Sequence, residues 1–390
     1  MHLKPINLHD TLHDIENIAR EFGIEGDLVE GGAFGNGLIN DTLAGTFEVD
    51  GKRRRYVLQR INHSVFKDPV GLMANVERVC SHIRRKLDDD GVEHIERRSL
   101  TLMHTTAGHS LYYNAGKDQY WRCYRYINHC TSYDTVSTEE QAFEASRKFA
   151  EFQKLVADMP GPRLIETIPD FHNTPKRFAA LEQAIAADPC GRAKDCQAEI
   201  AFALARREMA AHLLNLHEAG HIPERITHND TKLSNVLICD MTGSGMCVVD
   251  LDTVMPGLSL YDFGDMVRTC VSPGEEDTTD LSTIHVRLPM FEALARGFIS
   301  ELDGMLTPAE KANLAFAGKL LTFEVGIRFL TDHLLGDKYF SIKRPGHNID
   351  RCRTQFKLVE SIEENEAAMD AYVETLTTGI ATETRFTKKG

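Results

Sequence analysis

A short polar segment near the middle of the chain carries several side chains that could act on one reacting group. Residues 226–237 read ITHNDTKLSNVL, and this loop between apolar flanks contains His228, Asp230, Lys232 and Asn235. A carboxylate can orient or deprotonate an attacking hydroxyl group, and an amide oxygen nearby can help to hold Mg²⁺ against phosphates. The residue types in this loop therefore predict phosphoryl transfer to an alcohol.

Two further carboxylates follow at the end of an apolar stretch. Asp250 and Asp252 come fifteen and seventeen residues after Asn235, in the sequence VVDLD. The intervening segment predicts two short strands around a Gly-Ser-Gly turn, which would return the chain toward the loop. Asp230 or Asn235 alone would be explained by turn capping. The shared spacing, the loop context and the aspartate pair together favour a magnesium-dependent site.

The overall composition argues against several other functional classes. The chain has 390 residues, with 44 Lys and Arg against 58 Asp and Glu and a net charge of −14. Such a negative chain lacks the broad basic surface that duplex nucleic acids require. No apolar run approaches the ~18 residues of a membrane helix, and nine scattered cysteines without a CxxC pair fit a reducing compartment. We therefore expect a cytoplasmic protein that binds neither nucleic acid nor membrane.

The elements expected before the polar loop are mainly strands. Residues 28–62 predict strands around glycine-rich turns, with a hairpin formed by Thr42–Val49 and Tyr56–Ile61 across Asp50-Gly51. Apolar spacing further predicts a helix over 69–87 and a strand over 119–127.

Helices dominate from residue 138 onward. Apolar spacing predicts helices over 138–156 and 198–220, and a Thr-Pro-Ala-Glu capping box at 307–310 predicts a helix that extends to about Gly336. A chain of this length suggests two lobes. The order of elements predicts an α+β fold with a strand-rich N-lobe over 1–127 and a helical C-lobe over 128–390.

The polar loop also has the register of the protein-kinase catalytic loop, in which histidine, aspartate, lysine and asparagine stand at these spacings. The chain resembles the aminoglycoside phosphotransferase and choline kinase superfamily, and within it the N-acetylhexosamine 1-kinases most closely. The resembling segments are GNGLIN (35–40), YVLQRIN (56–62), NVERV (75–79), FHNTPKRF (171–178), THNDTKLSNVL (227–237), VDLDTVMPGLSLYDFGD (249–265) and GIRFLTDHLLGDKYF (326–340). The resemblance implies a protein-kinase-like two-lobed fold. It also implies Mg²⁺-dependent transfer of the γ-phosphate of ATP to the anomeric hydroxyl group of N-acetylglucosamine or N-acetylgalactosamine.

The resemblance assigns roles to the residues of the loop and of the following strand. Asp230 matches the catalytic aspartate that faces the sugar hydroxyl group. Asn235 and Asp250 match the magnesium ligands, and Asp252 stands close enough in sequence to assist them. Lys232 could reach the transferred phosphate, with a solvated lysine as the alternative.

The nucleotide is expected to contact the front part of the chain. The segment GGAFGNG predicts a loop between two strands, where a backbone without Cβ atoms could approach phosphates. The resemblance gives Gly35, Asn36 and Gly37 this role, although glycine-rich hairpins are often plain turns. Gln59 stands where protein kinases have a lysine for the phosphates. The sugar 1-kinases also have a glutamine at this position. Glu77 matches the glutamate that orients a phosphate-contacting residue, with a surface helix glutamate as the alternative.

The acceptor is expected to contact the later part of the chain. Arg328 and Tyr339 match residues that contact the N-acetyl sugar in the resembling kinases. The alternatives are an ion pair of Arg328 with Asp332 one helical turn away, and core packing of Tyr339. Leu38 and Thr269 replace a histidine and a phenylalanine near the sugar in that family, so the identity of the sugar depends on them. The run KYFSIKRPGHNIDRCR is cationic on balance, which favours a neutral acceptor over an aminoglycoside or choline.

Two further motifs are interpreted as structural. The resemblance implies that Asp262 and Asp265, in LYDFGD, support the fold and are not part of the site. HEAGH at 217–221 matches a zinc-protease pattern, which needs both histidines on one helix face. Gly220 lies inside the pattern and Pro223 follows it, so we expect two helix-end histidines.

Two alternatives to a sugar 1-kinase stay open at this point. The chain could be a kinase of the same superfamily for another small alcohol, such as a different sugar, a methylthiopentose or an amino alcohol. It could also be a catalytically inactive binding module with a kinase-like fold, although that would require loss of Asp230 or of a metal ligand, and the sequence retains them.

Overall fold

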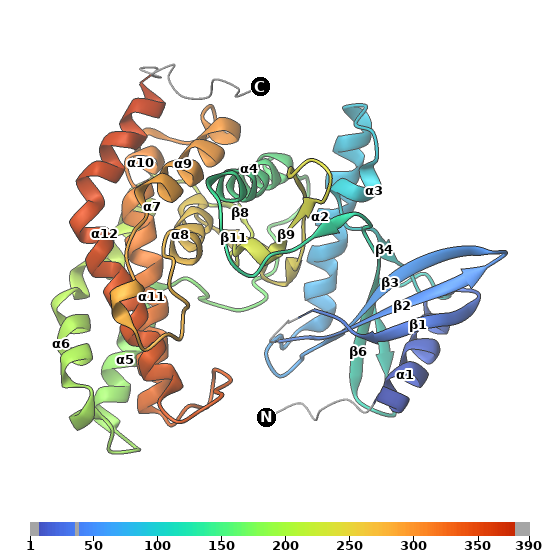
Figure 1. Cartoon of the computed structure of the whole chain (residues 1–390), viewed down its shortest axis with the longest axis horizontal. Helices are drawn as coiled ribbons and strands as arrows, with labels where there is room; N and C mark the ends of the chain where they lie inside the picture. The colour runs from blue at the N-terminus through green and yellow to red at the C-terminus, as the bar shows by residue number, and fades with distance from the viewer. Residues whose placement is uncertain (1–7, 36–38, 379–390) are drawn as a thin grey trace. The chain divides into compact units, whose positions relative to one another are not determined.

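The computed structural model describes residues 8–35 and 39–378, whose contacts divide into two compact units (Figure 1). The first unit comprises residues 1–130, 158–169 and 246–255, and the second comprises 131–157, 170–245 and 256–390. The first is built on an antiparallel sheet and the second is mainly helical. The fold class is therefore α+β, as the sequence predicts.

The elements up to residue 131 are mostly strands. They are α1 (Leu8–Glu21), β1 (Asp27–Ala33), β2 (Asp41–Val49), β3 (Lys52–Ile61), α2 (Pro69–Asp89), α3 (Ile95–Arg98), β4 (Leu102–Met103), β5 (Tyr112–Asn114), β6 (Gln119–Arg125) and β7 (Cys130–Thr131). The sheet of the first unit has the strand order β1-β2-β3-β6-β4, and β5 pairs with β6. The predicted hairpin is confirmed, because β2 and β3 pair antiparallel across Asp50-Gly51. Both turn residues have positive φ, 50° and 71°, as a tight two-residue hairpin requires.

The sheet of the first unit has two faces with different contents. On one face, Ile15 and Ile18 of α1 share a hydrophobic core with Leu58 of β3 and Trp121 of β6. Side chains alternate between the faces along a strand. The opposite face therefore carries Gln59, which pairs in register with Arg122 of β6. Polar side chains thus form a row on the face away from α1.

Helix α2 confirms the predicted helix and holds two later segments in the first unit. The Asp68 side chain caps it by accepting from the Gly71 N–H at 2.9 Å. Asn75 in α2 bonds both backbone groups of Ile165, at 2.7 and 3.1 Å, and donates to the Val254 carbonyl at 3.3 Å. One buried amide therefore joins the 158–169 and 246–255 segments to the strand-rich unit.

The elements after residue 131 are mostly helices. They are α4 (Glu139–Val156), α5 (Thr174–Ala187), α6 (Gln197–Ala205), α7 (His212–Glu218), β8 (Arg225–Thr227), β9 (Val236–Cys239), β10 (Gly245–Val248), β11 (Met255–Gly257), α8 (Ser259–Cys270), α9 (Leu288–Leu302), α10 (Pro308–Lys311), α11 (Leu314–Leu334) and α12 (His347–Thr377). In the second unit α11 packs against α12, α8 and α5, and α4 packs against α9. A Cβ on Gly264 of α8 would lie 2.4 Å from the Ala317 carbonyl, so glycine permits the close approach of α8 and α11.

Two helices that the sequence predicts as continuous are interrupted. The stretch 198–220 forms α6 and α7 with a 3₁₀ turn, Arg207–Ala211, between them. The helix from 307 to Gly336 is divided into α10 and α11, although the predicted capping box between Thr307 and Glu310 is present. Apolar spacing continued through both breaks, which explains the wrong prediction of continuity.

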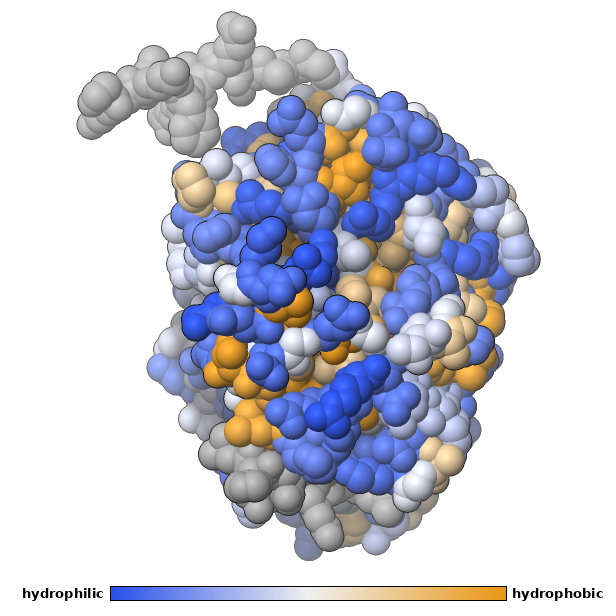
Figure 2. All heavy atoms as spheres, turned by 90° about the vertical axis from the view of Figure 1, so that its right-hand side faces the viewer, coloured by the Kyte–Doolittle hydropathy of each residue, from blue (hydrophilic) through white to orange (hydrophobic). Residues whose placement is uncertain are grey.

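The surface carries few large apolar side chains. The face shown in Figure 2 is mainly hydrophilic, with hydrophobic side chains in small separate groups. Within residues 8–35 and 39–378, helices fall short of the length and hydropathy that crossing a bilayer requires.

Candidate active site

The backbone of the polar loop is held by an aspartate of α8. Asp262 is fully buried, and its carboxylate accepts from the N–H groups of His228 at 3.0 Å and Asn229 at 2.7 Å. Gln153 of α4 donates to the same carboxylate at 2.6 Å. Burial raises the pKa of Asp262, while His228 and these hydrogen bonds oppose the rise. Asp262 thus positions the loop, in line with the structural role expected for it.

A second aspartate of α8 continues this support. Asp265 accepts from the Thr231 N–H at 2.8 Å and pairs with Arg268 at 2.8 Å. The Thr231 hydroxyl donates to the Asp262 carbonyl at 2.6 Å. Residues on both sides of Asp230 are therefore tied to α8.

The carboxylate of Asp230 has one occupied and one open oxygen. Its Oδ2 accepts from Lys232 Nζ at 2.9 Å and from Asn235 Nδ2 at 3.0 Å. Its Oδ1 makes no hydrogen bond within the described part of the chain. Burial opposes ionisation of this group, but Lys232, His228 and Asn235 together lower the pKa of Asp230. An ionised carboxylate with a free oxygen can accept a hydrogen bond from an alcohol.

Asn235 presents an amide oxygen of the kind that can bind magnesium. Its amide nitrogen donates to the carbonyl of Asp230 at 2.8 Å as well as to the carboxylate, which fixes the amide plane. Its Oδ1 makes no hydrogen bond to the residues described. Amide and carboxylate oxygens suit Mg²⁺, which takes one or two protein ligands and completes its shell with phosphates and waters.

The two aspartates of VVDLD have different surroundings in the first unit. Asp250 is half-buried, has a φ of 60° and precedes a 3₁₀ turn, Leu251–Thr253. Asp252 is buried, and its two oxygens accept from Asn40 Nδ2 at 2.6 Å and from Arg122 Nη1. Both oxygens of Asp252 are thus committed to protein donors. In the described ranges 8–35 and 39–378, His, Cys, Asp and Glu do not form a metal-binding cluster of three.

Arg122 is a charged residue of this region that the sequence reasoning missed. It is fully buried, donates from Nε to Gln59 Oε1 at 3.0 Å and pairs with Asp252. Gln59 in turn donates to the Thr42 hydroxyl at 3.0 Å. The arginine within the apolar strand QYWRCYR was the available signal, because an inward-facing cation needs a buried partner. A cation therefore stands beside Gln59, although the lysine of protein kinases is absent.

The other residues predicted for the nucleotide side are only partly described. Asn36, Gly37 and Leu38 lie outside the described residues. Gly35 has a φ of 75° and open space where a Cβ would be. Glu77 accepts from Ser110 at 2.9 Å and pairs with His104 at 3.0 Å. These two contacts join Glu77 to the segment between β4 and β5, and they do not connect Glu77 to Gln59.

The contacts of Arg328 differ from the predicted alternative. Its guanidinium lies over the rings of Phe171 and Phe340, 5.3 and 5.7 Å from their centroids. Within the described residues it has no ion pair with Asp332. Asp332 instead accepts from three successive N–H groups at Lys338, Tyr339 and Phe340, at 2.8 to 2.9 Å. The aspartate therefore shapes the loop after α11, and Arg328 keeps its donors available.

Tyr339 and Arg177 complete the polar surroundings of Arg328. Tyr339 is 61% exposed, so the alternative of core packing is wrong. Arg177 donates to the Phe171 carbonyl at 3.0 Å, and burial together with the charge of Arg328 lowers its pKa. Two guanidinium groups thus share this region of the second unit. Thr269, by contrast, donates to the Asp265 carbonyl of its own helix at 2.9 Å.

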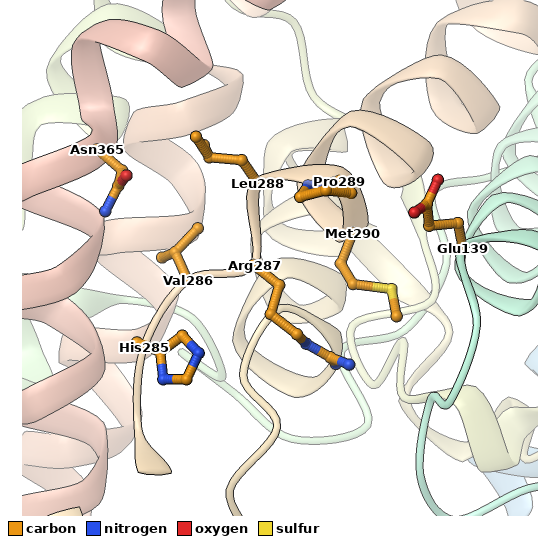
Figure 3. Close-up of a pocket in the computed structure, with 8 residues that line it drawn as sticks. All are labelled: Glu139, His285, Val286, Arg287, Leu288, Pro289, Met290 and Asn365. Atoms are coloured by element: carbon orange, nitrogen blue, oxygen red, sulfur yellow. The ribbon is translucent and has the colours of Figure 1, made fainter. Parts of the chain in front are cut away.

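A cavity of about 450 Å³ in the second unit contains none of the predicted residues (Figure 3). It is lined by Glu139, His285, Val286, Arg287, Leu288, Pro289, Met290 and Asn365. The Arg287 guanidinium bonds the carbonyls of Cys270 and Val271, at 2.9 and 3.2 Å, and so it serves the backbone.

The HEAGH segment has the helix end predicted for it. Helix α7 ends at Glu218, and His221 lies beyond it. His217 is bonded through Nδ1 to the Ile222 carbonyl at 2.8 Å. The two histidines therefore do not share a helix face.

Comparison with protein families identifies one match. The model of a family described as "Phosphotransferase enzyme family" matches residues 34–285, which include the polar loop and both carboxylates of VVDLD. This range is more than half of the chain.

Solved structures of phosphotransferases have the same fold. An aminoglycoside phosphotransferase from Alicyclobacillus acidocaldarius is 13% identical with a TM-score of 0.55, covering 96% of this chain and 98% of the other. A microcompartment-associated aminopropanol kinase is 13% identical with a TM-score of 0.54, covering 91% and 98%. A spectinomycin phosphotransferase in complex with ADP and spectinomycin is 14% identical with a TM-score of 0.52, covering 95% and 99%.

Proposed function

Because the chain belongs to the phosphotransferase enzyme family, we propose that it is an ATP- and Mg²⁺-dependent kinase for an N-acetylhexosamine. The product is the sugar 1-phosphate, formed at the anomeric hydroxyl group. The observation that carries the proposal is the Asp230 carboxylate, whose Oδ2 is bound by Lys232 and Asn235 while Oδ1 stays open.

Asp230 has the properties of the residue that receives the acceptor alcohol. Its Oδ1 accepts the hydrogen bond of the anomeric hydroxyl group and orients the oxygen toward the γ-phosphate. As the sugar oxygen bonds to the γ-phosphorus, the bond from that phosphorus to the ADP oxygen breaks, ADP leaves, and the hydroxyl proton passes to this carboxylate. The lowered pKa of Asp230 keeps it ionised at neutral pH, so its contribution is mainly orientation, as is usual in phosphoryl transfer.

The metal and the nucleotide are assigned to polar residues of the loop, of VVDLD and of the strand-rich part of the chain. Asn235 Oδ1 and the Asp250 carboxylate are the proposed Mg²⁺ ligands. The oxygens of Asp252 accept hydrogen bonds from Asn40 and Arg122. When bound, the metal neutralises charge on the phosphates of ATP. Gln59 and the segment around Gly35 are proposed to contact the nucleotide, and Asn36 and Gly37 remain part of that prediction.

A neutral acceptor fits the second unit better than an amine. Arg177 and Arg328 place two positive charges in one region, and the pKa of Arg177 is lowered by burial and then by Arg328. A cationic acceptor would add a third charge, whereas hydroxyl and acetamido groups can accept hydrogen bonds from guanidinium donors. Tyr339 offers an exposed aromatic ring beside them. We therefore propose Arg328 and Tyr339 as sugar-binding residues.

The second candidate is a kinase for another neutral sugar. Thr269 replaces the phenylalanine of the resembling kinases, and its hydroxyl group is engaged within α8. A smaller side chain at this position favours an acceptor with different substituents. Leu38 likewise replaces a histidine of the resembling kinases, and the identity of the sugar depends on this position as well.

A screen of ADP release over free sugars, choline, ethanolamine and aminopropanol tests the proposal. We expect release with N-acetylglucosamine or N-acetylgalactosamine and none above background with the amines. The matched control is the methyl glycoside of the active sugar, which lacks the free anomeric hydroxyl group and must be inactive. Turnover of the methyl glycoside would contradict phosphorylation at the anomeric position. Turnover of an amino alcohol alone would contradict the sugar assignment.

A further inference from the structure

A carboxylate with no role in the proposed reaction lies in the interior of the second unit. Glu324, in the middle of α11, has no exposed surface. Its two oxygens accept from different partners, His172 Nδ1 at 2.8 Å and Thr174 Oγ1 at 2.6 Å. An ionised carboxylate is costly to bury unless it is paired and hydrogen-bonded. His172 is therefore the charge partner that offsets the cost of burying this carboxylate.

The two ring nitrogens of His172 both face acceptors. Nδ1 faces the Glu324 carboxylate, and Nε2 lies 3.1 Å from the backbone carbonyl oxygen of Asn229. A carbonyl oxygen cannot donate, and neither can an ionised carboxylate. A neutral imidazole has one donor nitrogen only, so both contacts are satisfied when the ring is protonated on both nitrogens.

The charges around the pair support this assignment. Burial alone would raise the pKa of Glu324, but His172, Arg328 and Thr174 together hold that pKa below its usual range. From α11 Arg328 also acts on Glu324, and from α5 Arg177 lies within electrostatic range of it. Tyr261 of α8 packs against the His172 ring, 5.2 Å between centroids, and burial raises its pKa, so it stays neutral.

The carbonyl that His172 contacts belongs to the peptide bond directly before Asp230. Asn229 has a φ of 64°, a backbone conformation that non-glycine residues rarely adopt. The N–H group of the same peptide bond, from Asp230, points to His228 Nδ1 at 3.3 Å. One peptide plane is thus held on both sides, and its orientation decides where the Asp230 side chain begins.

We propose that His172, kept as an imidazolium by Glu324, is a positioning residue that fixes the Asn229–Asp230 peptide and so orients the Asp230 carboxylate. The inference rests on the phosphotransfer role proposed for Asp230, but it does not depend on which alcohol is the acceptor. Glu324 lies one helical turn before Arg328 in α11. The helix that carries a proposed sugar-binding residue therefore also holds the catalytic loop in place.

The protonation of His172 can be measured without any substrate. In the ¹⁵N-histidine-labelled full chain at pH 7.5, we expect both nitrogens of His172 to show imidazolium shifts, assigned with His172→Gln. His347 is an internal reference, because its Nε2 faces Asp277 while its Nδ1 accepts from the Lys343 N–H, a pattern that needs only one ring proton. A His172 ring with one proton would overturn the inference.

The kinetic test uses Glu324→Gln, which keeps the shape of the side chain and removes its charge. Loss of one charge-assisted hydrogen bond predicts a decrease in kcat of about tenfold to a hundredfold, with the KM for ATP unchanged. The matched control is Asp277→Asn, which removes the carboxylate that faces another buried histidine, His347, and should leave kcat unchanged. Thermal unfolding of each variant gives the folded fraction.

The outcomes separate this inference from the proposed substrate. The assays use whichever acceptor the ADP-release screen identifies, so failure of N-acetylhexosamines affects only the proposed function. A decrease in kcat of Glu324→Gln that vanishes after correction for the folded fraction would show a purely structural role and overturn the inference. So would equal losses in Glu324→Gln and Asp277→Asn.

Discussion

At the scale of single residues, the polar loop divides its side chains between two tasks. The backbone N–H groups of His228, Asn229 and Thr231 are bound by carboxylates of α8. Asp230 and Asn235, in contrast, bond to each other, with Lys232 as the third member. The first set holds the loop still, and the second leaves one carboxylate oxygen and one amide oxygen for ligands.

Replacing Lys232 with methionine tests the electrostatic balance at Asp230. Burial alone would raise the pKa of Asp230, and Lys232 is the foremost of the neighbours that together lower it. The ionised carboxylate is the active form, so activity falls as pH decreases through this pKa. Without Lys232 the pKa of Asp230 rises, and the loss of kcat on the acid side should begin at a higher pH than in the wild type.

The pH dependence of kcat for Lys232→Met checks this prediction. Lys311→Met is the matched control, because Lys311 pairs with an aspartate, Asp303, at 2.6 Å on the surface of the second unit. Its acid limb should coincide with that of the wild type. An unchanged or lower acid limb in Lys232→Met would contradict the role of Lys232.

At the scale of elements, strand β6 contributes a buried cation to the first unit. Arg122 stands in register with Gln59 of β3, on the face of the sheet away from α1. Neighbouring Arg60 points to the other face, where it pairs with Asp41 at 2.6 Å and is partly exposed. The two arginines therefore differ in burial, although they lie on adjacent strands.

Arg122→Met should destabilise the first unit strongly, because it leaves Asp252 buried with only Asn40 as a side-chain donor. Removing one partner of a buried ion pair costs about 3–5 kcal/mol. Arg60→Met is the control, because the Arg60–Asp41 pair keeps partial contact with solvent and should contribute less, on the order of 1 kcal/mol. Urea unfolding measures both. Equal losses in the two variants would show that the Arg122–Asp252 pair has no special role.

The loop after α11 is a second element-scale feature. The carboxylate of Asp332 accepts from three backbone N–H groups and from the Asn348 side chain, which fixes the segment that carries Tyr339. If Tyr339 contacts the acceptor, release of this segment should affect the acceptor and leave the nucleotide unaffected.

Asp332→Asn places an amide N–H₂ where an acceptor is needed. We expect the KM for the acceptor to rise by about tenfold, because roughly one hydrogen bond to a charged group is lost. The KM for ATP should not change. Asp280→Asn is the control, because Asp280 likewise accepts from a backbone N–H, that of Ser282, at 3.1 Å. Initial-rate kinetics with each substrate varied measure both constants. A rise confined to the KM for ATP would contradict the assignment.

At the scale of the whole molecule, binding of the proposed ligands is linked to the stability of the folded chain. A ligand that binds only the folded chain raises its stability, by about 2.7 kcal/mol at a hundredfold excess over its dissociation constant. Mg²⁺–ATP should therefore raise the Tm, and ATP with EDTA should raise it much less.

Differential scanning calorimetry of three variants extends this prediction. Asn235→Ala and Asp250→Ala should lose the part of the Tm increase that depends on Mg²⁺. Asp230→Asn should keep it while kcat falls by at least about a hundredfold, a loss that misorientation of the attacking hydroxyl group can cause. An Mg²⁺-dependent increase in Asn235→Ala equal to that of the wild type would exclude Asn235 as a ligand.

The sequence predicted local structure correctly where interactions between neighbouring residues determine it. The Asp50-Gly51 hairpin, α2 and the Thr307–Glu310 capping box depend on neighbouring residues, and the predictions are confirmed. The stretch 198–220 was predicted as one helix and contains a 3₁₀ turn. Apolar periodicity reports which side chains are buried, and it does not report a change in backbone winding.

The sequence by itself predicts the chemistry proposed for the polar loop, because the residue types and spacings of His228, Asp230, Lys232 and Asn235 are local properties. It also determined the α+β class. Only the tertiary structure decided which buried charges are partners. Arg122 meets Asp252 across 130 positions, and His172 meets Glu324 across 152. No local pattern encodes such pairs, since a buried charge takes as its partner whichever group the packing of distant elements brings within hydrogen-bond distance.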